Sequence, residues 1–480
     1  MTARPRPALT PTTRRGVLGL LAGLVLVVAP GCDGFLDIND DPNEPTQVPV
    51  SALLASTSFA TGSNIFALGG ITTNYVQQLA SPNRASASDT YERVSFDGTW
   101  GALYDTMGDL TLLEAQAAEE GATDYVGIAK VLKALHLASA VDTWGDVPYS
   151  EAFDPGGTLN PSYDSGEALY DEVFTLLADG IAALQAGGST SVPGGDDFVY
   201  GGDTDLWVKA AYALRARYLN HLTKTGQYDP QAVLAAVDQA FDSEAENMDV
   251  AYFDEQINPW ADVAIDNANL FLGGWLSEQL VQALDGTTYG VFDPRIEAYT
   301  DTTDAGVYLG TENGAGRGDA SEAGDRSVLT TNTYYARRTA PLEIVTYAEV
   351  KLIEAEAALR AGQRDRAYGA YLEAIRAHMA KLGVDAGAAE AYVSDPAVGV
   401  GAAALSLDDV FREKYKVMFL NPEAWVDARR YDYAYAGFTL PANAELSDFI
   451  RRVDYPDTEY SRNASNVPES SLLGRVWWDR

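Results

Sequence analysis

Apolar residues recur at intervals of three and four positions along several stretches of the chain. Between Leu169 and Leu184 this spacing predicts a helix with one buried face, and Asp164 and Ser165 are its candidate caps. The same spacing predicts a second helix from Asp205 to Thr223. A third helix-rich stretch is predicted from Leu407 to Arg430.

The clearest helix pair is predicted from Leu342 to Leu382. Apolar residues at helical spacing line its first half, Gly362 interrupts the pattern, and the spacing resumes at Ala367. Alanines where two helices would cross allow the backbones to approach closely, as in a tetratricopeptide unit. Residues 123–142 and 169–186 form a second candidate pair with a less regular period. We therefore expect an all-α fold whose scaffold is built from tetratricopeptide-like helix pairs.

Long segments without helical periodicity separate these helices. They are residues 187–204, 251–270 and 300–335. The last segment combines many Asp and Thr residues with glycines, namely Gly306, Gly310, Gly314, Gly316, Gly318 and Gly324. Loops of this length inside a compact domain are usually functional or disordered. We expect these long irregular loops to build the ligand-binding face on the helical scaffold.

Residues 1–31 differ in kind from the rest of the chain. Their positive charge comes from Arg4, Arg6, Arg14 and Arg15. The apolar stretch 16–30 that follows is typical of an export signal and is shorter than the roughly 20 residues of a membrane-spanning helix. Residues 13–18 also fit a twin-arginine signal, so the Sec and twin-arginine routes both stay open. The predicted division is a lipoprotein signal peptide over 1–31, a lipidated extended leader over 32–50 and a single helical domain over 51–480.

Cys32 is the only cysteine, so the chain has no intramolecular disulfide. It directly follows the apolar run, where bacterial lipoprotein signals are cleaved and the cysteine is acylated. Ala29 and Pro30 depart from the residues that usually precede such a cysteine. No later segment is long and apolar enough to span a bilayer. We predict that Cys32 carries the lipid that anchors the protein to the membrane.

The charge balance excludes some classes of partner. With 33 basic and 69 acidic residues the net charge is −36, and loss of the arginine-rich signal makes the mature chain more negative. Such a surface repels nucleic acid and bare anionic membrane, so neither is expected to bind directly. Hydrophobic residues make up 46% of the chain and no linker divides it, which favours one domain with an ample core.

Sequence motifs for metal, nucleotide or catalytic chemistry are lacking. Each histidine falls within a helical pattern without a His or Cys at metal-ligand spacing, which favours a core or helix-surface role. The histidines are His136, His221 and His378. Residues 37–41 begin like a calcium loop, but Pro42 and Val48 stand where that loop requires Gly and Glu. Residues 314–318 resemble a phosphate loop without its flanking strand and helix. We therefore predict no catalytic residue, no metal and no cofactor.

Aromatic residues give a better indication of function. Sugar rings present apolar faces that stack on Tyr and Trp, while polar side chains bind the hydroxyls. The candidate ligand-binding residues, in or beside the irregular segments, are Trp260, Tyr289, Tyr308 and Tyr334, with Tyr335 next to the last. The alternative that each packs its own loop onto the scaffold stays open. Tryptophans in or next to helical patterns are predicted core residues; these are Trp100, Trp144, Trp207 and Trp425.

Several segments, taken together and in order, resemble one protein family. Cys32–Asn39 followed by Asp41–Thr46 resembles the start of a mature SusD/RagB-type outer-membrane lipoprotein. Further matches follow at Trp144–Ala152, Tyr163–Ser165, Asp197–Asp203 with Trp207, Asp293–Arg295, Thr346–Val350, Glu423–Trp425 with Arg429 and Arg430, and Arg451–Pro456. The resemblance covers essentially the whole mature chain and fits the SusD-like branch best.

This resemblance implies a nutrient-binding lipoprotein exposed on the outer membrane, with four tetratricopeptide-like helix pairs and ligand-binding loops. Such a protein captures an oligosaccharide or a peptide and delivers it to a SusC-like TonB-dependent β-barrel transporter, without catalysing a reaction. Two other functions stay open from the sequence. One is a surface polysaccharide hydrolase, and the other is a structural or adhesive helical-repeat lipoprotein that binds no small ligand.

The motifs that carry the resemblance are predicted to be structural. Gly145 suits a sharp turn after a helix, and Asp146 is placed to bind nearby backbone N–H groups. Paired arginines near the end of the chain are expected to bind carboxylates and so hold the last helices. They are Arg429, Arg430, Arg451 and Arg452, with Glu423 and Asp427 among the expected partners. Ligand specificity would lie in the loops that match no pattern.

Overall fold

The computed structural model of the protein describes residues 48–154, 156–270 and 273–480. Residues Pro49–Arg480 form one compact unit. The predicted signal peptide, Cys32 and nearly all of the leader lie outside the described residues, so lipidation and the division of the chain stay predictions. Within the described ranges, none of the helices combines the length and the apolar content that crossing a membrane requires.

Helices account for most of the secondary structure. The longer ones are α1 (Val50–Tyr75), α2 (Asp97–Glu120), α3 (Thr123–Trp144), α4 (Gly166–Gln185), α5 (Thr204–His221), α7 (Pro259–Leu270), α10 (Tyr347–Arg360), α11 (Arg364–Lys381) and α13 (Leu407–Val417). The shorter ones are α6 (Pro230–Val237), α8 (Glu278–Leu284), α9 (Ile296–Tyr299), α12 (Ala386–Ser394), α14 (Glu423–Arg430) and α15 (Asp457–Arg462). The strands β1 (Leu79–Ala80), β2 (Met248–Val250), β3 (Trp275–Leu276) and β4 (Leu342–Val345) form two antiparallel pairs, β1 with β3 and β2 with β4.

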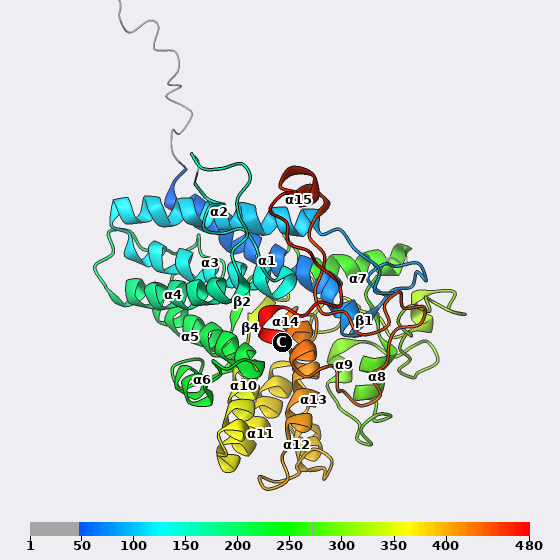
Figure 1. Ribbon diagram of the computed structural model, residues 1–480. Helices are drawn as coiled ribbons and strands as arrows, with labels where there is room; N and C mark the ends of the chain where they lie inside the picture. The colour runs from blue at the N-terminus through cyan, green and yellow to red at the C-terminus, as the bar shows by residue number, and fades with distance from the viewer. Residues whose placement is uncertain (1–47, 155, 271–272) are drawn as a thin grey trace, which may run out of the picture. The chain divides into compact units, whose positions relative to one another are not determined.

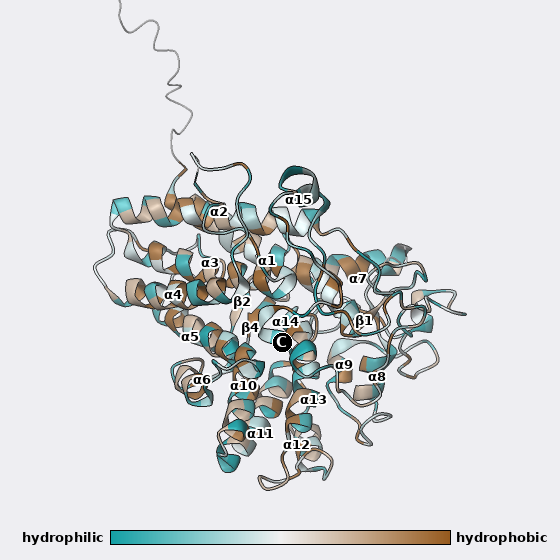
Figure 2. Ribbon diagram, in the orientation of Figure 1, coloured by the Kyte–Doolittle hydropathy of each residue, from teal (hydrophilic) through white to brown (hydrophobic). Residues whose placement is uncertain are grey.

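The long helices stack in succession. Each helix from α1 to α6 packs on the next, α6 packs on α10, and α10 is followed by α11 and α12 (Figure 1). Helix α7 and the short elements α8, α9 and β1 lie with the irregular segments on the other side of this stack. Brown and teal residues alternate along α2 and α4 (Figure 2), as expected for helices with one buried face, whereas nearly all of α3, which lies between them, is buried. The predicted scaffold of stacked helices that carries long loops is confirmed.

The predicted pair over 123–142 and 169–186 corresponds to α3 and α4, and glycines set how closely these two helices approach. A Cβ atom on Gly127 of α3 would lie 2.5 Å from Leu184 Cγ and 3.0 Å from the Gly180 carbonyl oxygen of α4. Backbone therefore packs directly on backbone where the helices meet, which only a residue without a side chain allows. Ser165 caps α4 as predicted, because its hydroxyl accepts a hydrogen bond from Ala168 N.

The pair predicted most clearly, over residues 342–382, corresponds to α10 and α11 but begins later than the pattern indicates. Gly362 ends α10 with a φ of 75°, as predicted. Residues Leu342–Val345 form β4 rather than helix, because the Thr346 hydroxyl accepts from Glu349 N and starts α10 only there. The prediction of an irregular segment over 251–270 was also wrong at its end. There Asn258 Oδ1 accepts from Trp260 N at 2.7 Å and helix α7 follows.

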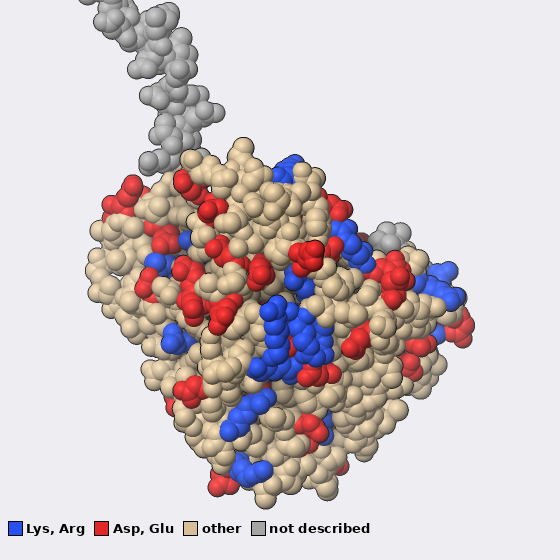
Figure 3. Space-filling model, viewed as in Figure 1, with Lys and Arg blue, Asp and Glu red and all other residues tan. Residues whose placement is uncertain are grey.

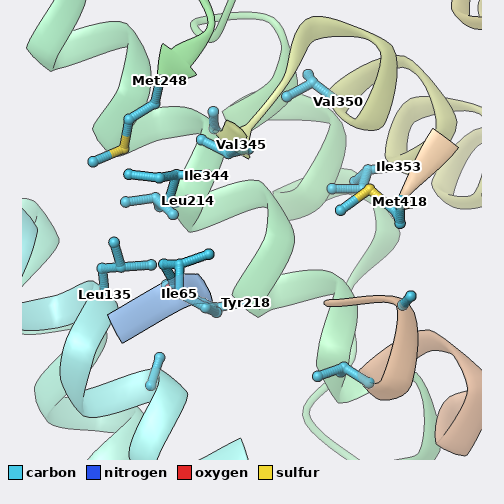
Figure 4. Packing of buried hydrophobic residues seen from close by; sticks show 14 of the residues in the cluster. Ile65, Leu135, Leu214, Tyr218, Met248, Ile344, Val345, Val350, Ile353 and Met418 are labelled. Carbon is cyan, nitrogen blue, oxygen red and sulfur yellow. The ribbon is translucent and has the colours of Figure 1, made fainter. Parts of the chain in front are cut away.

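The core lies where the helical stack meets the two central strands. Figure 4 shows Ile65 of α1, Leu135 of α3, Leu214 of α5, Met248 of β2 and Ile344 of β4 converging on one another. All these side chains are buried. The predicted core tryptophans, Trp100, Trp144, Trp207 and Trp425, are buried as well.

The three histidines are core residues, as the helical pattern favours. His221 connects two elements, because its Nδ1 lies 2.7 Å from Tyr170 Oη and its Nε2 lies 2.5 Å from Glu423 Oε1. His378 Nε2 lies 2.9 Å from Tyr335 Oη. His136 Nδ1 lies 2.7 Å from the Leu132 carbonyl oxygen, one turn earlier in its own helix.

The segment that begins at Trp144 is structural, as predicted from its chemistry. Gly145 has a φ of 88° directly after α3. The Asp146 carboxylate accepts a hydrogen bond from Gly166 N at 2.8 Å and so fixes the start of α4. Asp164 accepts from Tyr149 N and Ser150 N at 2.9 and 2.8 Å rather than capping the helix.

The arginines near the end of the chain divide into two kinds. Arg430 pairs with Asp427 and Glu356, each at 2.5 Å, as predicted. Arg429 and Arg452 do not bind carboxylates among the described residues, and that part of the prediction was wrong. Arg429 donates to the carbonyl oxygens of residues 142, 425 and 451, and its guanidinium lies 3.7 Å from the centre of the Trp425 ring. Arg452 donates to the Trp144 carbonyl.

Three basic side chains bind carboxylates near the C-terminus. Lys224, Arg451 and Arg475 surround Asp432 at 2.8, 2.9 and 2.9 Å and also bind Asp479. In Figure 3 basic side chains gather where Figure 1 marks the C-terminus, on a face where acidic side chains are otherwise widespread. These cations balance carboxylates of the chain itself and hold its last residues to the helices.

Candidate functional site

Open cavities occur between the described loops and the helices next to them, and three of them are wide enough for a ligand. The one that we call the helix-side cavity has a volume of about 740 Å³ and lies between residues 291–298 and helices α11 and α12. The glycine-loop cavity of about 610 Å³ lies between residues 82–84 and 315–318. The α7 cavity of about 450 Å³ lies between α7 and residues of the segment 301–331. Two of the three are thus walled by the long glycine-rich loop.

The walls of the glycine-loop cavity approach each other so closely that glycine is required. A Cβ atom on Gly316 would lie 2.8 Å from Arg84 N, and Gly316 has a φ of 73°. Arg317 N donates to the Pro82 carbonyl oxygen at 3.0 Å. The two loop segments are therefore held backbone to backbone, with exposed Asn83, Arg84 and Arg317 at the cavity.

A buried carboxylate, Asp89, holds the loops together behind this cavity. It accepts hydrogen bonds from Asn313 Nδ2 and from Gly314 N, each at 2.5 Å. Burial raises the pKa of Asp89 to about 6, although these hydrogen bonds act in the opposite direction. Asn443 Nδ2 donates to the Gly314 carbonyl at 3.0 Å, which adds a third loop to the assembly.

The α7 cavity combines an apolar wall with polar groups. Its apolar residues are Ala264, Ile265, Ala268, Val328 and Leu329, and its polar ones include Asn267, Asn269, Asp301, Thr302, Asp304, Arg326, Thr330 and Thr331. The orientation of the Asn267 amide is fixed by Trp275, whose indole N–H can only donate and therefore faces Oδ1. Asn267 Nδ2 is buried and has no hydrogen-bond partner among the described residues.

The two cavities of the glycine-rich loop adjoin one another. Gly318 lines the first, and the Cβ position on this residue lies 3.7 Å from Arg326 NH2, which belongs to the second. Arg326 is held by Asp319 at 2.6 Å. Guanidinium, amide, hydroxyl and carboxylate groups thus line these two neighbouring cavities, which together can both donate and accept hydrogen bonds. In the part of the chain that the structure describes, no group of His, Cys, Asp and Glu is arranged to hold a metal ion.

The helix-side cavity is different in character. Phe292 is 47% exposed at its edge, and its acidic residues are Glu297, Asp385 and Asp395. The wall residue Tyr392 donates its hydroxyl hydrogen to Glu413 at 2.9 Å, and Lys416 donates to the same hydroxyl at 2.7 Å. This wall is therefore backed by a buried charge network.

That network explains the segment Asp293–Arg295. Arg295 donates from Nε and NH2 to Asp293 at 2.9 and 2.6 Å, and NH2 also lies 2.5 Å from Glu413. Lys416 binds the same two carboxylates at 3.0 and 3.2 Å. All four side chains are buried, so the loop after α8 is fixed to α13 by paired charges.

The aromatic residues predicted to bind a ligand do not come together. Trp260 is 5% exposed and packs edge-on against Phe66, with the ring centres 4.8 Å apart. Tyr289 is half-buried between Arg412 and Lys416. Tyr334 is half-buried under Arg337, and its hydroxyl lies 3.2 Å from Glu343. Tyr308 is half-buried near Phe292.

None of these four residues lines the three open cavities, so their contact with a ligand stays a prediction. The groups that do line the loop cavities, Arg84, Asn267 and Arg317 among them, were missed. The only sequence signal for them was the run of glycines around Arg317.

The architecture is that of a helical-repeat scaffold whose long loops carry polar cavities. The model of a family described as "Starch-binding associating with outer membrane", the SusD-like family, matches residues 42–456. The chain belongs to this family of outer-membrane-associated binding proteins. No curated protein matches the chain.

Solved structures share the fold. A SusD/RagB family protein from Bacteroides thetaiotaomicron is 22% identical with a TM-score of 0.73, and the match covers 90% of this chain and 99% of that one. A SusD homologue from Bacteroides fragilis is 21% identical with a TM-score of 0.75, over 90% and 100% of the two chains. A chitin-binding SusD homologue from Flavobacterium johnsoniae is 20% identical with a TM-score of 0.74, over 89% and 98%.

Proposed function

We propose that the protein captures an oligosaccharide at the outer cell surface, in the two adjoining cavities of its glycine-rich loop. The observation that carries this proposal is the loop site itself, in which hydrogen-bonding groups of every kind stand beside an apolar wall. A pyranose has this double character, since hydroxyls surround apolar C–H faces. Membership of a family described as starch-binding supports the same class of ligand, and so does the chitin-binding relative.

Asn267 provides a specific anchor in this proposal. A buried amide N–H without a partner is unfavourable by about 1–3 kcal/mol, and a ligand oxygen would satisfy it. The carboxylates of Asp301 and Asp304 accept hydrogen bonds from sugar hydroxyls, and Arg326 donates. The apolar residues of α7 would lie under the ring.

The location and the partner are inferred from the resemblance together with the family match. Acyl chains on Cys32 would hold the protein at the outer membrane, and contact with a partner would complete the anchor because one acyl chain alone binds only marginally. A SusC-like TonB-dependent transporter would then receive the captured oligosaccharide. The same route would serve a peptide in place of a sugar.

The test is calorimetric titration of residues 33–480, produced without lipid, with a panel of oligosaccharides and peptides. Asn267→Ala is expected to weaken binding by about two- to tenfold, the effect of one lost neutral hydrogen bond. Asn160→Ala is the matched control, since Asn160 is exposed and lies outside the three cavities. Thermal unfolding of both variants separates loss of binding from loss of fold.

The titration also distinguishes the rival functions. Saturable binding of an intact oligosaccharide supports capture. Cleavage of a panel member would replace capture with a surface hydrolase. Binding of no panel member, together with tight association with a protein, would favour a structural or adhesive role.

A further inference from the structure

The α7 cavity changes in character from its buried end to its mouth. The buried residues of its lining are Ala264, Asn267, Val328 and Leu329. Among these, only Asn267 has a polar side chain. The carboxylates of Asp301 and Asp304 belong to exposed residues of the same lining. A single amide therefore lies at an apolar buried end, and acidic groups lie at the mouth.

The amide of Asn267 offers the cavity a hydrogen-bond donor. Its Oδ1 accepts from the indole N–H of Trp275, a residue that does not line the cavity. Its Nδ2 is buried and has no hydrogen-bond partner among the described residues. Because Asn267 lines the cavity and Trp275 does not, we place Nδ2 on the cavity side of the planar amide. By contrast, Asn269 Nδ2 donates to the Ile265 carbonyl oxygen at 2.8 Å.

A carbonyl oxygen suits this buried end better than a hydroxyl does. A hydroxyl that accepts from Asn267 also brings an O–H donor, and the other buried side chains of the lining are apolar. A buried donor without an acceptor is unfavourable. A carbonyl oxygen only accepts, so one N–H satisfies it. A methyl group beside that carbonyl would contact Ala264 and Val328, which are 4% and 8% exposed.

The mouth of the cavity supplies an acceptor for the rest of the ligand. The carboxylate of Asp304 forms no hydrogen bond or ion pair with a side chain within residues 48–154, 156–270 and 273–480. Asp301 is already engaged, because its Oδ2 accepts from Thr330 Oγ1 at 2.7 Å and from Asn332 Nδ2 at 3.4 Å. The cavity thus requires an acceptor and an apolar group at its buried end and a donor nearer its mouth. An acetamido group combines a carbonyl, a methyl and an N–H.

We propose that the α7 cavity binds the acetamido group of a 2-acetamido sugar in the captured glycan. The carbonyl oxygen accepts from Asn267 Nδ2, the methyl group packs on Ala264 and Val328, and the N–H donates to Asp304. This inference rests on the proposed function and names the class of sugar for one of its two cavities. A hexose with a hydroxyl at the same carbon provides neither the methyl group nor an oxygen that only accepts.

The experiment compares two neutral tetrasaccharides by calorimetry on residues 33–480. The tetramer of N-acetylglucosamine and cellotetraose share the same β-1,4-linked backbone and differ only in the group at carbon 2. The acetylated tetramer is expected to bind about tenfold or more tightly, because it pairs the buried N–H and buries a methyl group. In ligand-observed saturation-transfer NMR, its acetyl methyl protons should receive the most saturation from the protein.

Asn267→Asp tests the donor directly. It keeps the oxygen that binds Trp275 and replaces Nδ2 by a second oxygen, so it is expected to abolish the preference for the acetylated tetramer. Asn160→Ala is the matched control, since this amide is exposed and lies outside the three cavities, and it should leave the preference unchanged. Thermal unfolding shows whether each variant is folded. If Asn267→Asp does not fold, the ligand pair and the NMR measurement on the parent protein decide the question.

The outcomes separate this inference from glycan capture itself. If cellotetraose binds as tightly as the acetylated tetramer, or if folded Asn267→Asp keeps the preference, the acetamido proposal is overturned while glycan capture stands. Saturation concentrated on ring protons would also overturn it. Tighter binding of the neutral peptide acetyl-tetraalanine amide than of either sugar would assign the cavity to a peptide instead. If no oligosaccharide binds here or in the panel, both proposals fail.

Discussion

Replacement of Arg295 by Met should show how strongly paired charges hold the loop after α8 to α13. The guanidinium is fully buried and binds the carboxylates of Asp293 and Glu413; Lys416 binds both of them as well, and Arg412 Nε lies 3.3 Å from Glu413. Without Arg295, the buried Asp293 is paired with Lys416 alone among the described residues, and Lys416 is shared with Glu413. Removing one partner of a buried charge pair destabilises a protein by about 3–5 kcal/mol, because the remaining charge stays desolvated.

This loss can be converted to a change in melting temperature. Unfolding entropy is about 2.1 cal/mol/K per residue, so the compact unit Pro49–Arg480 has about 0.9 kcal/mol/K. The Arg295→Met variant should therefore melt about 3–6 °C below the parent protein. Arg376→Met is the matched control, because its partner Glu390 is exposed and such pairs contribute about 0–1 kcal/mol.

The loss of stability in the Arg295→Met variant should also depend on pH. Burial alone would raise the pKa of Glu413, but Lys416, Arg295 and Arg412 outweigh it and hold that pKa below its ordinary value. Such a carboxylate contributes stability above its unfolded pKa and loses it as the pH falls through the folded value. The difference in unfolding free energy between the parent protein and the variant should therefore be largest near pH 7 and should decrease below about pH 4.

Urea unfolding followed by tryptophan fluorescence, with calorimetry at several pH values, measures both effects. A variant within 1 kcal/mol of the parent at pH 7 would refute the reasoning. A difference in unfolding free energy that increases as the pH falls would also refute it.

Three further predictions concern stability. Asp197→Ala should lower the free energy of unfolding in urea by about 2–4 kcal/mol, because the carboxylate accepts hydrogen bonds from Trp207 Nε1 and from three backbone N–H groups. Asp197→Asn should lower it less. Burial raises the pKa of Asp89 to about 6, so the free energy of unfolding of the parent relative to Asp89→Asn should fall by about 2 kcal/mol as the pH rises from 4 to 7. An unchanged difference would contradict this sign. Trp260→Ala should lower stability by about 3–5 kcal/mol in the same assay, since the ring packs on Phe66.

The features that the sequence predicted correctly depend on regular spacing along a helix or on a single residue at a helix end. The helix pair with Gly362 at its break follows from apolar spacing and from the positive φ that glycine adopts. The contact of Asp146 with a backbone N–H was predicted from the chemistry of a short polar side chain at a turn. In both cases the residue that was recognised in the sequence stands at a helix end, although the partner of Asp146 lies 20 positions along the chain.

The errors have a common physical origin. Arg429 was expected to bind a carboxylate because acidic residues are abundant nearby in sequence, but it lies over Trp425 and donates to carbonyl groups. Leu342–Val345 was assigned to a helix although it pairs with β2, a strand from a distant part of the chain. Neither the packing of a guanidinium nor the pairing of a strand is encoded by local spacing.

The residues of the candidate site were even harder to predict from local sequence. The aromatic residues were selected because they occur in loops, yet Trp260 is buried and none of the four lines a loop cavity. Residues 82–84 and 315–318 are far apart in sequence, and they line one cavity because Gly316 lets the two backbones touch.

By itself, the sequence determined the helical scaffold, the family and the strongly acidic character of the chain, because periodicity, ordered motifs and composition are properties of the chain alone. The tertiary structure decided which loops meet, which charges are neutralised and which remain at a cavity. Those outcomes depend on contacts between segments far apart in the chain. The free energies of these contacts depend on how much surface is buried and on the distances between charged groups, and both are defined only once the chain has folded.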